Sequence, residues 1–413
     1  MVWAAVVASL ADALSRIYAR VPLGIRLGLD GMRGACRAAG SPEAAFEVVH
    51  IAGTNGKGSV SAMVESIARA HGLRTGLFTS PHLARFAERI RIDAAAMDDA
   101  ALAALLTEAL DRAPELTFFE TATLAAFLAF REAKVDLAIL EVGLGGRLDA
   151  TNVVPTPRAA AITRIAFDHA DRLGTTLDAI AREKAGIAKP GLEILLGPLL
   201  PEARAAIDGV ARAAGATTRS VPNDEEAMQF VRTARIGLLG DHQKDNAAIA
   251  YLLGARLGAT VAERAEGLAR VEWPGRLETV RTPEGNVLLD AAHNPDGVDS
   301  LVRYVEALGK PRDRVALVYG VLADKPWMEM TDRVSAIADQ RFYVRPSGRA
   351  AVDPVTLAAR RPGRIEESAG EAYAHARAAV GPEGLVVVCG SILLVGEMRS
   401  ALLGVPTDPP VAM

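Results

Sequence analysis

The sequence predicts an α/β protein, with a mostly parallel sheet in a large N-terminal domain and a second, smaller α/β domain after it. Short β-branched runs alternate with longer segments rich in Ala, Leu, Glu and Arg, a pattern typical of βαβ units. The 413 residues exceed the roughly 250 to 300 that one hydrophobic core serves. The adjacent Pro274 and Gly275 in "EWPGR" interrupt the alternation, which predicts domains over residues 1–272 and 273–413.

The first domain contains five candidate strands, separated by stretches of helical length. Before them, residues 1–20 are predicted to form an amphipathic helix, because they lack the basic start of a signal peptide and soon reach Asp12 and Arg16. Residues 60–72 have the apolar spacing of a helix that stops at Gly72. The candidate strands are "FEVVHIAG" (46–53), "RTGLFTS" (74–80), "VDLAILEVG" (135–143), "RAAAITRI" (158–165) and "LEILLG" (192–197).

The second domain restarts the alternation after the boundary, and we expect a Rossmann-like α/β unit with helices between its strands and a final helix after the last one. Its candidate strands are "NVLLDAAHNP" (286–295), "RVALVYGV" (314–321), "RFYVRP" (341–346) and "GLVVVCG" (384–390).

Composition excludes several classes of function. The formal net charge of -4 gives no broad attraction to nucleic acid or to an anionic membrane, so an anionic ligand needs a local positive pocket. Cys36 and Cys389 are the only cysteines, which excludes a disulfide framework and a C-x-x-C metal site and favours buried thiols in a reducing compartment. Charged residues interrupt the apolar runs well before the ~20 residues of a membrane span, so we expect a cytoplasmic protein.

The segment "IAGTNGKGS", residues 51–59, predicts a phosphate-binding loop with unusual spacing. A strand precedes it and a helix follows, so backbone N–H groups and the helix dipole converge there, and Lys57 adds a point charge; the first domain is therefore expected to be P-loop-type. In the standard loop G-x-x-x-x-G-K-[ST], a hydroxyl directly after the lysine holds Mg²⁺. Here Gly58 occupies that position and Ser59 comes one position late, so the metal hydroxyl must come from elsewhere.

The loop is the first of seven motifs that occur in a recognisable order. They are "GTNGKGS", "FTSPHLARFAERIRI", "EVGLGGRLDATN", "DHADRLG", "REKAGI", "PGR" and "LDAAHNPDG", and they span most of the sequence. The series resembles the Mur ligase family, and in particular its folylpolyglutamate synthase/dihydrofolate synthase branch. The resemblance implies that the loop binds ATP through Thr54, Asn55, Gly56, Lys57, Gly58 and Ser59.

The resemblance also supplies the missing metal hydroxyl. It implies that Ser80 and Glu141 hold Mg²⁺. It places His169 with Glu141 at a second Mg²⁺, with Asp168 as an orienting neighbour of the histidine. The residues agree for the first pair, because Ser80 and Glu141 both end candidate strands, and parallel sheets bind ligands at the carboxyl ends of their strands. Taken alone, Ser80 before Pro81 would more often be a simple turn.

In this family the motif that reads "REKAGI" here carries a carbamylated lysine, which implies a carbamylated Lys184. Addition of CO₂ to a neutral amine converts a cation into an anion that nearby Mg²⁺ would stabilise. From the residues alone, Lys184 would be a solvated lysine on a helix through 177–189. The resemblance thus gives Lys57, Lys184 and His293 as catalytic residues, with His293 assigned to the incoming amine or the acyl phosphate.

The remaining site residues also follow from the resemblance. Asn246, Arg276 and Asp290 are expected to contact ATP from opposite sides of the hinge, so that domain closure assembles the site. Lys325 is expected to pair with a glutamate carboxylate, although Pro326 replaces the second acid of the branch's usual D-K-D. The other expected substrate residues are Leu148, Asp149, Ala150 and Ser391, and the segments "LGLDGM" (27–32) and "TFFETAT" (117–123) are expected to contact the pterin.

The predicted function is ATP-dependent ligation of L-glutamate to a pteroate or folate carboxylate through an acyl phosphate, by a monomer that uses ATP and one or two Mg²⁺. The acceptor is dihydropteroate, a reduced folate or both. One alternative is another Mur-type ligase that makes peptidoglycan precursors, but such enzymes place a nucleotide-sugar domain before the loop, where only about fifty residues stand. The other is a P-loop regulatory ATPase, against which "LDAAHNPDG" argues.

Overall fold

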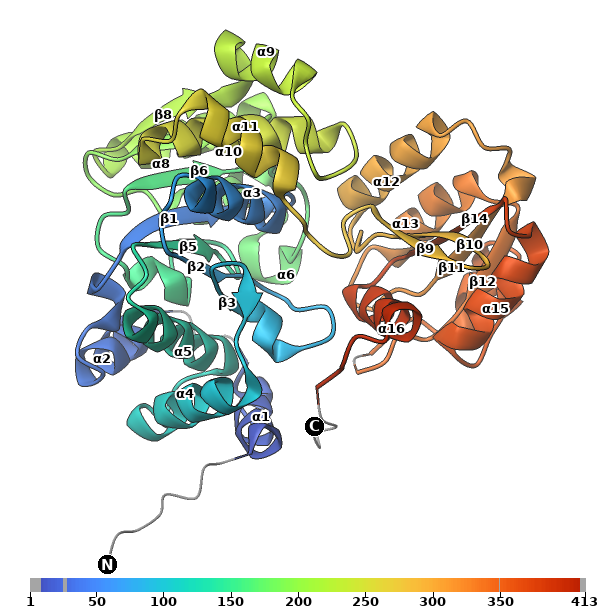
Figure 1. Ribbon diagram of the computed structural model, residues 1–413, viewed down its shortest axis with the longest axis horizontal. Coiled ribbons are helices and arrows are strands. Elements are labelled where there is room, and N and C mark those ends of the chain that lie inside the picture. Colours follow the sequence, from blue (N-terminus) through green and yellow to red (C-terminus); the bar gives the residue numbers. More distant parts are fainter. Residues whose placement is uncertain (1–8, 25–27, 349, 409–413) are drawn as a thin grey trace, which may run out of the picture.

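Strand β1 (Glu47–Ala52) lies inside the first sheet and is buried from Val48 onward. In the computed structural model, which describes residues 9–24, 28–348 and 350–408, eight strands form this sheet (Figure 1). The strand pairs are parallel except at the β4–β3–β2 edge. In spatial order the strands are β4 (Ala95–Ala96), β3 (Ile90–Ile92), β2 (Thr75–Phe78), β5 (Leu137–Glu141), β1, β6 (Ala159–Ile162), β7 (Glu193–Leu196) and β8 (Thr217–Ser220).

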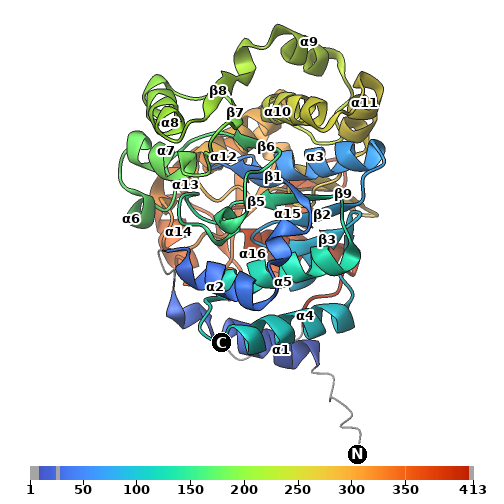
Figure 2. The same ribbon diagram turned by 90° about the vertical axis from the view of Figure 1, so that its left-hand side faces the viewer.

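Helices cover both faces of this sheet, because alternate strand residues point to opposite faces and both sets are apolar. Figure 2 shows α3, α10 and α11 on one side of the strands and α2, α4 and α5 on the other. One face packs against α1 (Leu10–Tyr18), α2 (Asp30–Ala38), α4 (Asp99–Arg112), α5 (Phe118–Ala133), α7 (Leu177–Ala185) and α8 (Pro201–Ala213), with the short α6 (Ala170–Leu173) before α7. The other packs against α3 (Lys57–Ala70), α9 (Glu225–Thr233), α10 (His242–Leu257) and α11 (Val261–Arg270).

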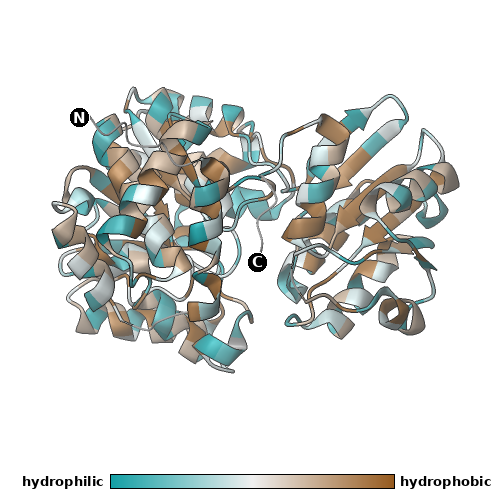
Figure 3. Cartoon of the chain, turned by 90° about the horizontal axis from the view of Figure 1, so that it is seen from below, coloured by the Kyte–Doolittle hydropathy of each residue, from teal (hydrophilic) through white to brown (hydrophobic). Residues whose placement is uncertain are grey.

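The second sheet is smaller, and among the described residues only β9 runs antiparallel to its neighbour. Figure 3 shows hydrophobic residues concentrated in its strands, between the helices on its two faces. The strand order is β13 (Arg364–Ile365), β12 (Gln340–Tyr343), β11 (Val315–Tyr319), β14 (Leu385–Cys389), β10 (Gly285–Leu289) and β9 (Glu278–Thr282). One face is covered by α12 (Pro295–Ala307), α13 (Trp327–Val334) and α14 (Pro354–Arg360), the other by α15 (Ala369–Val380) and α16 (Ile392–Leu403).

The predicted two-domain α/β class is confirmed, and each predicted strand is present in its sheet. The strands that sequence reasoning missed are all at or near sheet edges: β3, β4, β8, β9 and β13. Strand β8 reads "TTRS", with partly or fully exposed side chains, so it has no apolar run to reveal it. Strands β4 and β13 contain two residues each, too few to show a period.

The predicted N-terminal amphipathic helix is confirmed over Leu10–Tyr18, where Ser9 caps the helix and apolar residues face the core. Residues 1–8 of that prediction lie outside the described residues. Within the described part of the chain, no helix combines the length and apolar character needed to cross a bilayer. Between Arg270, where α11 ends, and Glu278, where β9 begins, the chain passes from the first sheet to the second.

Candidate active site

A cleft between the two domains brings most of the predicted site residues together. Its walls are the phosphate loop, the segment after β2, the end of β5, the last turn of α7, the first turn of α10, the segment before β9 and the segment after β10. The predicted residues that line it are Thr54, Asn55, Gly56, Lys57, Gly58, Ser59, Ser80, Glu141, His169, Lys184, Asn246, Arg276, Asp290 and His293.

The phosphate loop depends on two glycines with left-handed backbone. Gly53 has φ 146°, and a Cβ there would lie 1.9 Å from the hydroxyl oxygen of Thr163. Gly56 has φ 91° and immediately precedes α3, which therefore begins at Lys57 rather than at the predicted residue 60. The lysine and the two residues after it form the first helical turn. Its free backbone N–H groups and the positive end of the helix dipole favour a bound phosphate.

Other loop side chains are held within the first domain. The Thr54 hydroxyl donates to the Ala166 carbonyl and accepts from the Ala166 N–H, both at 3.1 Å. Ser59 is buried, and its hydroxyl accepts a hydrogen bond from Gln243 Nε2 in α10 at 3.3 Å. Lys57 Nζ donates to the Thr54 carbonyl at 3.1 Å. The loop is thus shaped before any ligand arrives.

Ser80 and Glu141 meet at the ends of neighbouring strands β2 and β5. The Ser80 N–H donates to Glu141 Oε2 at 3.2 Å, and the peptide bond from Ser80 to Pro81 is cis. Burial raises the pKa of the Glu141 carboxyl, while Lys57, 3.9 Å away, and the Ser80 N–H oppose that rise. A hydroxyl and a carboxylate that line one cleft are the oxygen donors that Mg²⁺ prefers, so this pair fits the predicted metal.

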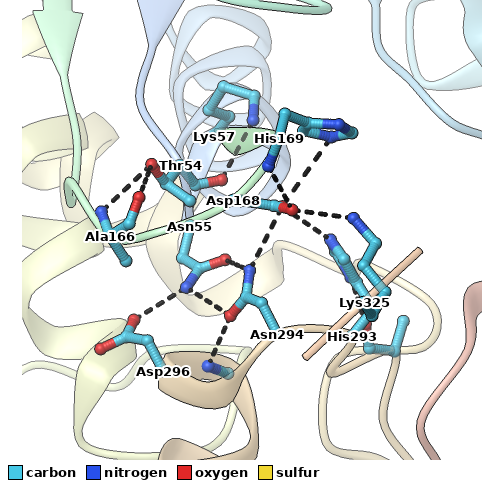
Figure 4. A network of polar contacts seen from close by, with 12 residues as sticks. Thr54, Asn55, Lys57, Ala166, Asp168, His169, His293, Asn294, Asp296 and Lys325 are labelled. Atoms are coloured by element: carbon cyan, nitrogen blue, oxygen red, sulfur yellow. Dashed lines mark hydrogen bonds and ion pairs between the residues drawn. The ribbon is translucent and has the colours of Figure 1, made fainter. Parts of the chain in front are cut away.

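Asp168 is the centre of a charged cluster in the cleft (Figure 4). Its carboxylate accepts a hydrogen bond from Lys325 Nζ at 2.8 Å and lies 3.6 Å from His293 Nε2 and 3.9 Å from His169 Nε2. Burial alone would raise the pKa of Asp168, but contact with His293 and the charge of Lys325 hold it well below its usual value. Burial lowers the pKa of His169, which favours the neutral ring that a metal needs.

Lys184 is a buried residue in the last turn of α7. Its side chain donates from Nζ to the carbonyl of Gly53, the first residue of the phosphate loop, at 2.8 Å. Burial and the charge of Lys57 lower the pKa of Lys184 to about 7. Near neutral pH, a large fraction of the amine is therefore uncharged, which is the form that reacts with CO₂. The solvated-lysine interpretation is wrong, and the helix ends at Ala185 rather than at residue 189.

A set of hydrogen bonds between the domains was not predicted (Figure 4). Asn55 Nδ2 donates to Asn294 Oδ1 at 3.1 Å and to Asp296 Oδ2 at 2.8 Å, and Asn294 Nδ2 donates to Asn55 Oδ1 at 2.9 Å. Asp296 Oδ1 also accepts from Arg164 Nε at 2.7 Å. Asn294 caps α12, and Asp296 lies in its first turn. We call Asn55, Arg164, Asn294 and Asp296 the interdomain clasp.

The second domain presents Arg276 and Asp290 to the cleft, while Asn246 reaches it from α10 of the first. The Asp290 carboxylate accepts hydrogen bonds from the N–H groups of Leu277 and Ala292, both at 2.9 Å. Burial raises the pKa of Asp290, and the charge of Arg276 opposes that rise. One wall therefore presents a helix terminus and the opposite wall a guanidinium, an arrangement suited to a polyphosphate between them.

None of the five individually predicted substrate residues is among those that line the cleft: Leu148, Asp149, Ala150, Lys325 and Ser391. The buried Asp149 carboxylate accepts hydrogen bonds from the N–H and hydroxyl of Thr151, which organises the loop before the short helix η4 (Ala150–Val153). Lys325 pairs with Asp168, beside the cleft. The Ser391 hydroxyl caps helix α16. The substrate roles of these residues stay predictions.

Comparisons with known proteins agree with this geometry. The Mur ligase middle domain matches residues 51–193, and the Mur ligase glutamate ligase domain matches residues 275–392. Dihydrofolate synthase/folylpolyglutamate synthase of Bacillus subtilis (strain 168) is 34% identical over 426 residues, covering 95% of this chain and 98% of the relative. Escherichia coli FolC in complex with DHPP and ADP matches with TM-score 0.87 at 31% identity, over 95% of this chain and 97% of that one. A bifunctional folylpolyglutamate synthase/dihydrofolate synthase with Mn, AMPPNP and L-glutamate bound matches with TM-score 0.85 at 30% identity, over 96% and 98%.

Proposed function

The chain belongs to the folylpolyglutamate synthase/dihydrofolate synthase branch of the Mur ligase family, and from this membership we propose that its cleft joins L-glutamate to the carboxylate of a pteroate or folate while converting ATP to ADP and phosphate. The proposal covers dihydrofolate synthase activity, folylpolyglutamate synthase activity or both. One observation carries it. The phosphate loop of the first domain and Arg276, Asp290 and His293 of the second line a single cleft. Related proteins bind DHPP with ADP, or AMPPNP with L-glutamate.

In the first step, an oxygen of the acceptor carboxylate attacks the γ-phosphorus of ATP. The bond from that phosphorus to the bridging oxygen breaks, and ADP leaves an acyl phosphate behind. We assign Lys57 and Arg276, from opposite walls of the cleft, to the transferring phosphoryl group, whose developing charge they offset. The remaining nucleotide contacts are assigned to Thr54, Asn55, Gly56, Gly58, Ser59, Asn246 and Asp290.

Ser80 and Glu141 are the residues that would hold Mg²⁺, with His169 at a second site. Bound Mg²⁺ supplies positive charge beside the phosphate oxygens. The Ser80 N–H already orients the Glu141 carboxylate, which supports the pair as ligands. Ser59 is the poorer candidate, because its hydroxyl is buried against Gln243.

We assign a carbamate to Lys184. The nitrogen of the neutral amine attacks the carbon of CO₂, an N–C bond forms, and one amine proton passes to water. The depressed pKa of about 7 supports this step, because an ammonium has no lone pair with which to attack. The carbamate nitrogen keeps one N–H, so it can still donate to the Gly53 carbonyl as the lysine does.

In the second step, the glutamate amine attacks the carbonyl carbon of the acyl phosphate, the bond from that carbon to the phosphate oxygen breaks, and the amine loses a proton. We assign the proton to His293. Its Nδ1 lies 2.9 Å from the Ala291 carbonyl oxygen, which can only accept. Nδ1 therefore carries the hydrogen of the neutral ring, and Nε2 is free to take one. Asp168, 3.6 Å from Nε2, would stabilise the imidazolium that forms.

The substrate contacts complete the proposal. Lys325 and Ser391 are assigned to a glutamate carboxylate, which would replace Asp168 as the partner of Lys325. Leu148, Asp149 and Ala150 are assigned to the pteroate. We further propose a monomeric, cytoplasmic enzyme whose ATP-binding domain spans residues 1–272 and whose glutamate ligase domain spans residues 273–413.

Release of phosphate from ATP tests the function. Purified protein is incubated with Mg²⁺ and ATP, adding dihydropteroate or tetrahydrofolate and L-glutamate separately and together. We expect rapid phosphate release only when an acceptor and glutamate are both present, with product that gains one glutamate residue by mass spectrometry. Equal phosphate release without glutamate would indicate a regulatory ATPase instead. Comparing the two acceptors decides which of the two synthase activities the enzyme has.

A further inference from the structure

The linker between the two sheets contains Trp273, three positions before Arg276. Its indole contacts two parts of the first domain. A Cβ added to Gly58, in the first turn of α3, would lie 3.0 Å from the indole Nε1 and 3.2 Å from Cζ2. On the β3 side, the Arg91 guanidinium carbon lies 4.8 Å from the indole ring centroid, within the range of a cation–π contact. The linker is therefore anchored on the phosphate-loop helix itself.

These contacts explain the unusual residue after Lys57. A standard phosphate loop has Ser or Thr at that position, and its side chain holds the metal. Here the indole lies so close that a Cβ at position 58 would make a tight contact at 3.0 Å, so a side chain there requires Trp273 to move by a few tenths of an ångström. The loop therefore lacks the usual hydroxyl at position 58, and the first turn of α3 packs against the indole of the linker instead.

The linker changes its attachment within two residues of Trp273. The Gly275 N–H donates to Glu278 Oε2, and the Gly275 carbonyl accepts from the Ala291 N–H, both at 2.8 Å, so Gly275 already belongs to the second domain. Only Pro274 lies between the two anchored residues, and its ring restricts φ. A displacement of the Trp273 backbone is therefore passed through Pro274 to Gly275 and Arg276.

We propose that Trp273 is a positioning residue of the ligation reaction: its packing on Gly58 sets where Arg276 stands over the phosphates bound by the loop. The inference rests on the proposed function, because it concerns the phosphoryl transfer assigned to Arg276. It adds a residue that is not among those lining the cleft and that acts through the shape of the linker. It also predicts that positions 58 and 273 are coupled by size.

A size-exchange cycle tests this coupling. Gly58→Ala should push the indole away, and Trp273→Leu should leave the linker loose, so each should lower kcat about tenfold or more. The dissociation constant for AMPPNP should stay within about threefold, because the loop backbone is intact. Combining the two substitutions refills the space, and kcat of the double variant should exceed that of either single one. Gly209→Ala is the matched control, because nothing lies within 4 Å of the added methyl group, and it should leave kcat unchanged.

Three results would overturn the proposal. They are wild-type kcat in both single variants, a double variant no better than the worse single one, or a loss explained entirely by weaker AMPPNP binding. If Trp273→Leu does not fold, as judged by its thermal melt, Trp273→Phe replaces it in the same cycle. A wild-type protein with no glutamate-dependent phosphate release would contradict the proposed function instead, so the two failures are distinguishable.

Discussion

On the first-domain side of the cleft, Lys57, Glu141 and Lys184 bond within their own domain. On the second-domain side, several polar side chains bond across the interface. Lys184 donates to the Gly53 carbonyl, and Glu141 accepts from the Ser80 N–H. By contrast, the partners of Asn294, Asp296 and Lys325 are Asn55, Arg164 and Asp168, all in the first domain. Asp290 is an exception, because backbone N–H groups of its own domain hold it.

This difference distinguishes the part of the site that is organised within the first domain from the part that forms only when the two domains come together. Lys57, the metal pair and Lys184 keep their geometry through contacts that exist in the first domain alone, as electrostatic stabilisation requires. The interdomain clasp and Lys325 hold their present positions only while the domains are together. Changes on the first side should therefore damage the chemistry directly. Changes to the interdomain clasp should act through the fraction of closed enzyme, with smaller effects.

Among changes on the preorganised, first-domain side of the cleft, substitution of Lys184 should cause the largest loss of activity. Lys184→Ala should lower glutamate-dependent ADP formation on the order of a hundredfold or more, because it removes the proposed anion. Acetate or another short carboxylic acid should restore part of that activity. Lys184→Arg is the matched control, since its cation remains and acetate should not rescue it. Full activity of the alanine variant in bicarbonate-free buffer would contradict a carbamate.

Substitutions of Ser80 and Ser59 test which serine holds the metal on the same side of the cleft. Ser80→Ala should lower kcat about ten- to a hundredfold and raise the Mg²⁺ concentration needed for half-maximal activity, because a metal ligand is lost. Ser59→Ala should remove the hydrogen bond from Gln243, worth about 1 kcal/mol of stability, but keep the backbone N–H of the first helical turn and leave the Mg²⁺ requirement unchanged. A Mg²⁺ titration of kcat in both variants measures the two effects. A larger Mg²⁺ requirement in Ser59→Ala than in Ser80→Ala would contradict the assignment of Ser80 as the metal ligand.

Charge exchanges within the interdomain clasp test whether contacts between the domains govern closure of the site. Arg164→Asp and Asp296→Arg should each lower kcat about tenfold, because like charges then face each other across the interface. The double exchange should recover much of the loss, since the ion pair re-forms. The same exchange of Arg112 and Glu108, a pair within α4, is the control and should change nothing. Failure of the double variant to recover would show that the clasp does not govern closure.

The smallest expected effect is the pH dependence of Lys184 carbamylation. Because burial and Lys57 lower the pKa of Lys184 to about 7 from an ordinary value near ~10.4, the neutral amine accumulates as pH rises through 7. Reactivation of CO₂-stripped enzyme by bicarbonate should therefore rise several-fold between about pH 6 and 8 and then level off. The unfolded chain keeps this proton up to about pH 10, so the free energy of unfolding of stripped enzyme should rise between about pH 7 and 10. Reactivation that keeps rising above about pH 9 would indicate an ordinary lysine.

Sequence patterns predicted the preorganised side better than the assembled one. The strand, glycine loop and helix around Lys57 are contiguous, so local residue types determine the phosphate site. The ends of parallel strands likewise predicted that Ser80 and Glu141 would meet. The burial of Lys184 could not be predicted from its neighbours in sequence, because its hydrogen-bond partner, the Gly53 carbonyl, lies 131 positions away.

The clasp and the linker contact had no local signal at all. Asn55 and Asp296 are 241 positions apart, and the motif that contains Asn294 and Asp296 reads as an ordinary helix cap. The spacing anomaly at Gly58 was visible, but its cause, the indole of Trp273, appears only when the linker is folded onto α3. Contacts between domains depend on how two finished folds dock, and no residue period encodes that.

Transfer of oxygen-18 from the acceptor to phosphate tests directly whether the cleft activates a carboxylate as an acyl phosphate. The acceptor carboxylate is labelled with oxygen-18 and incubated with enzyme, Mg²⁺, ATP and L-glutamate, and the released phosphate is analysed by mass spectrometry. We expect one labelled oxygen in phosphate for each glutamate joined, because the attacking carboxylate oxygen leaves with the phosphoryl group. Unlabelled phosphate, or label in AMP, would contradict it.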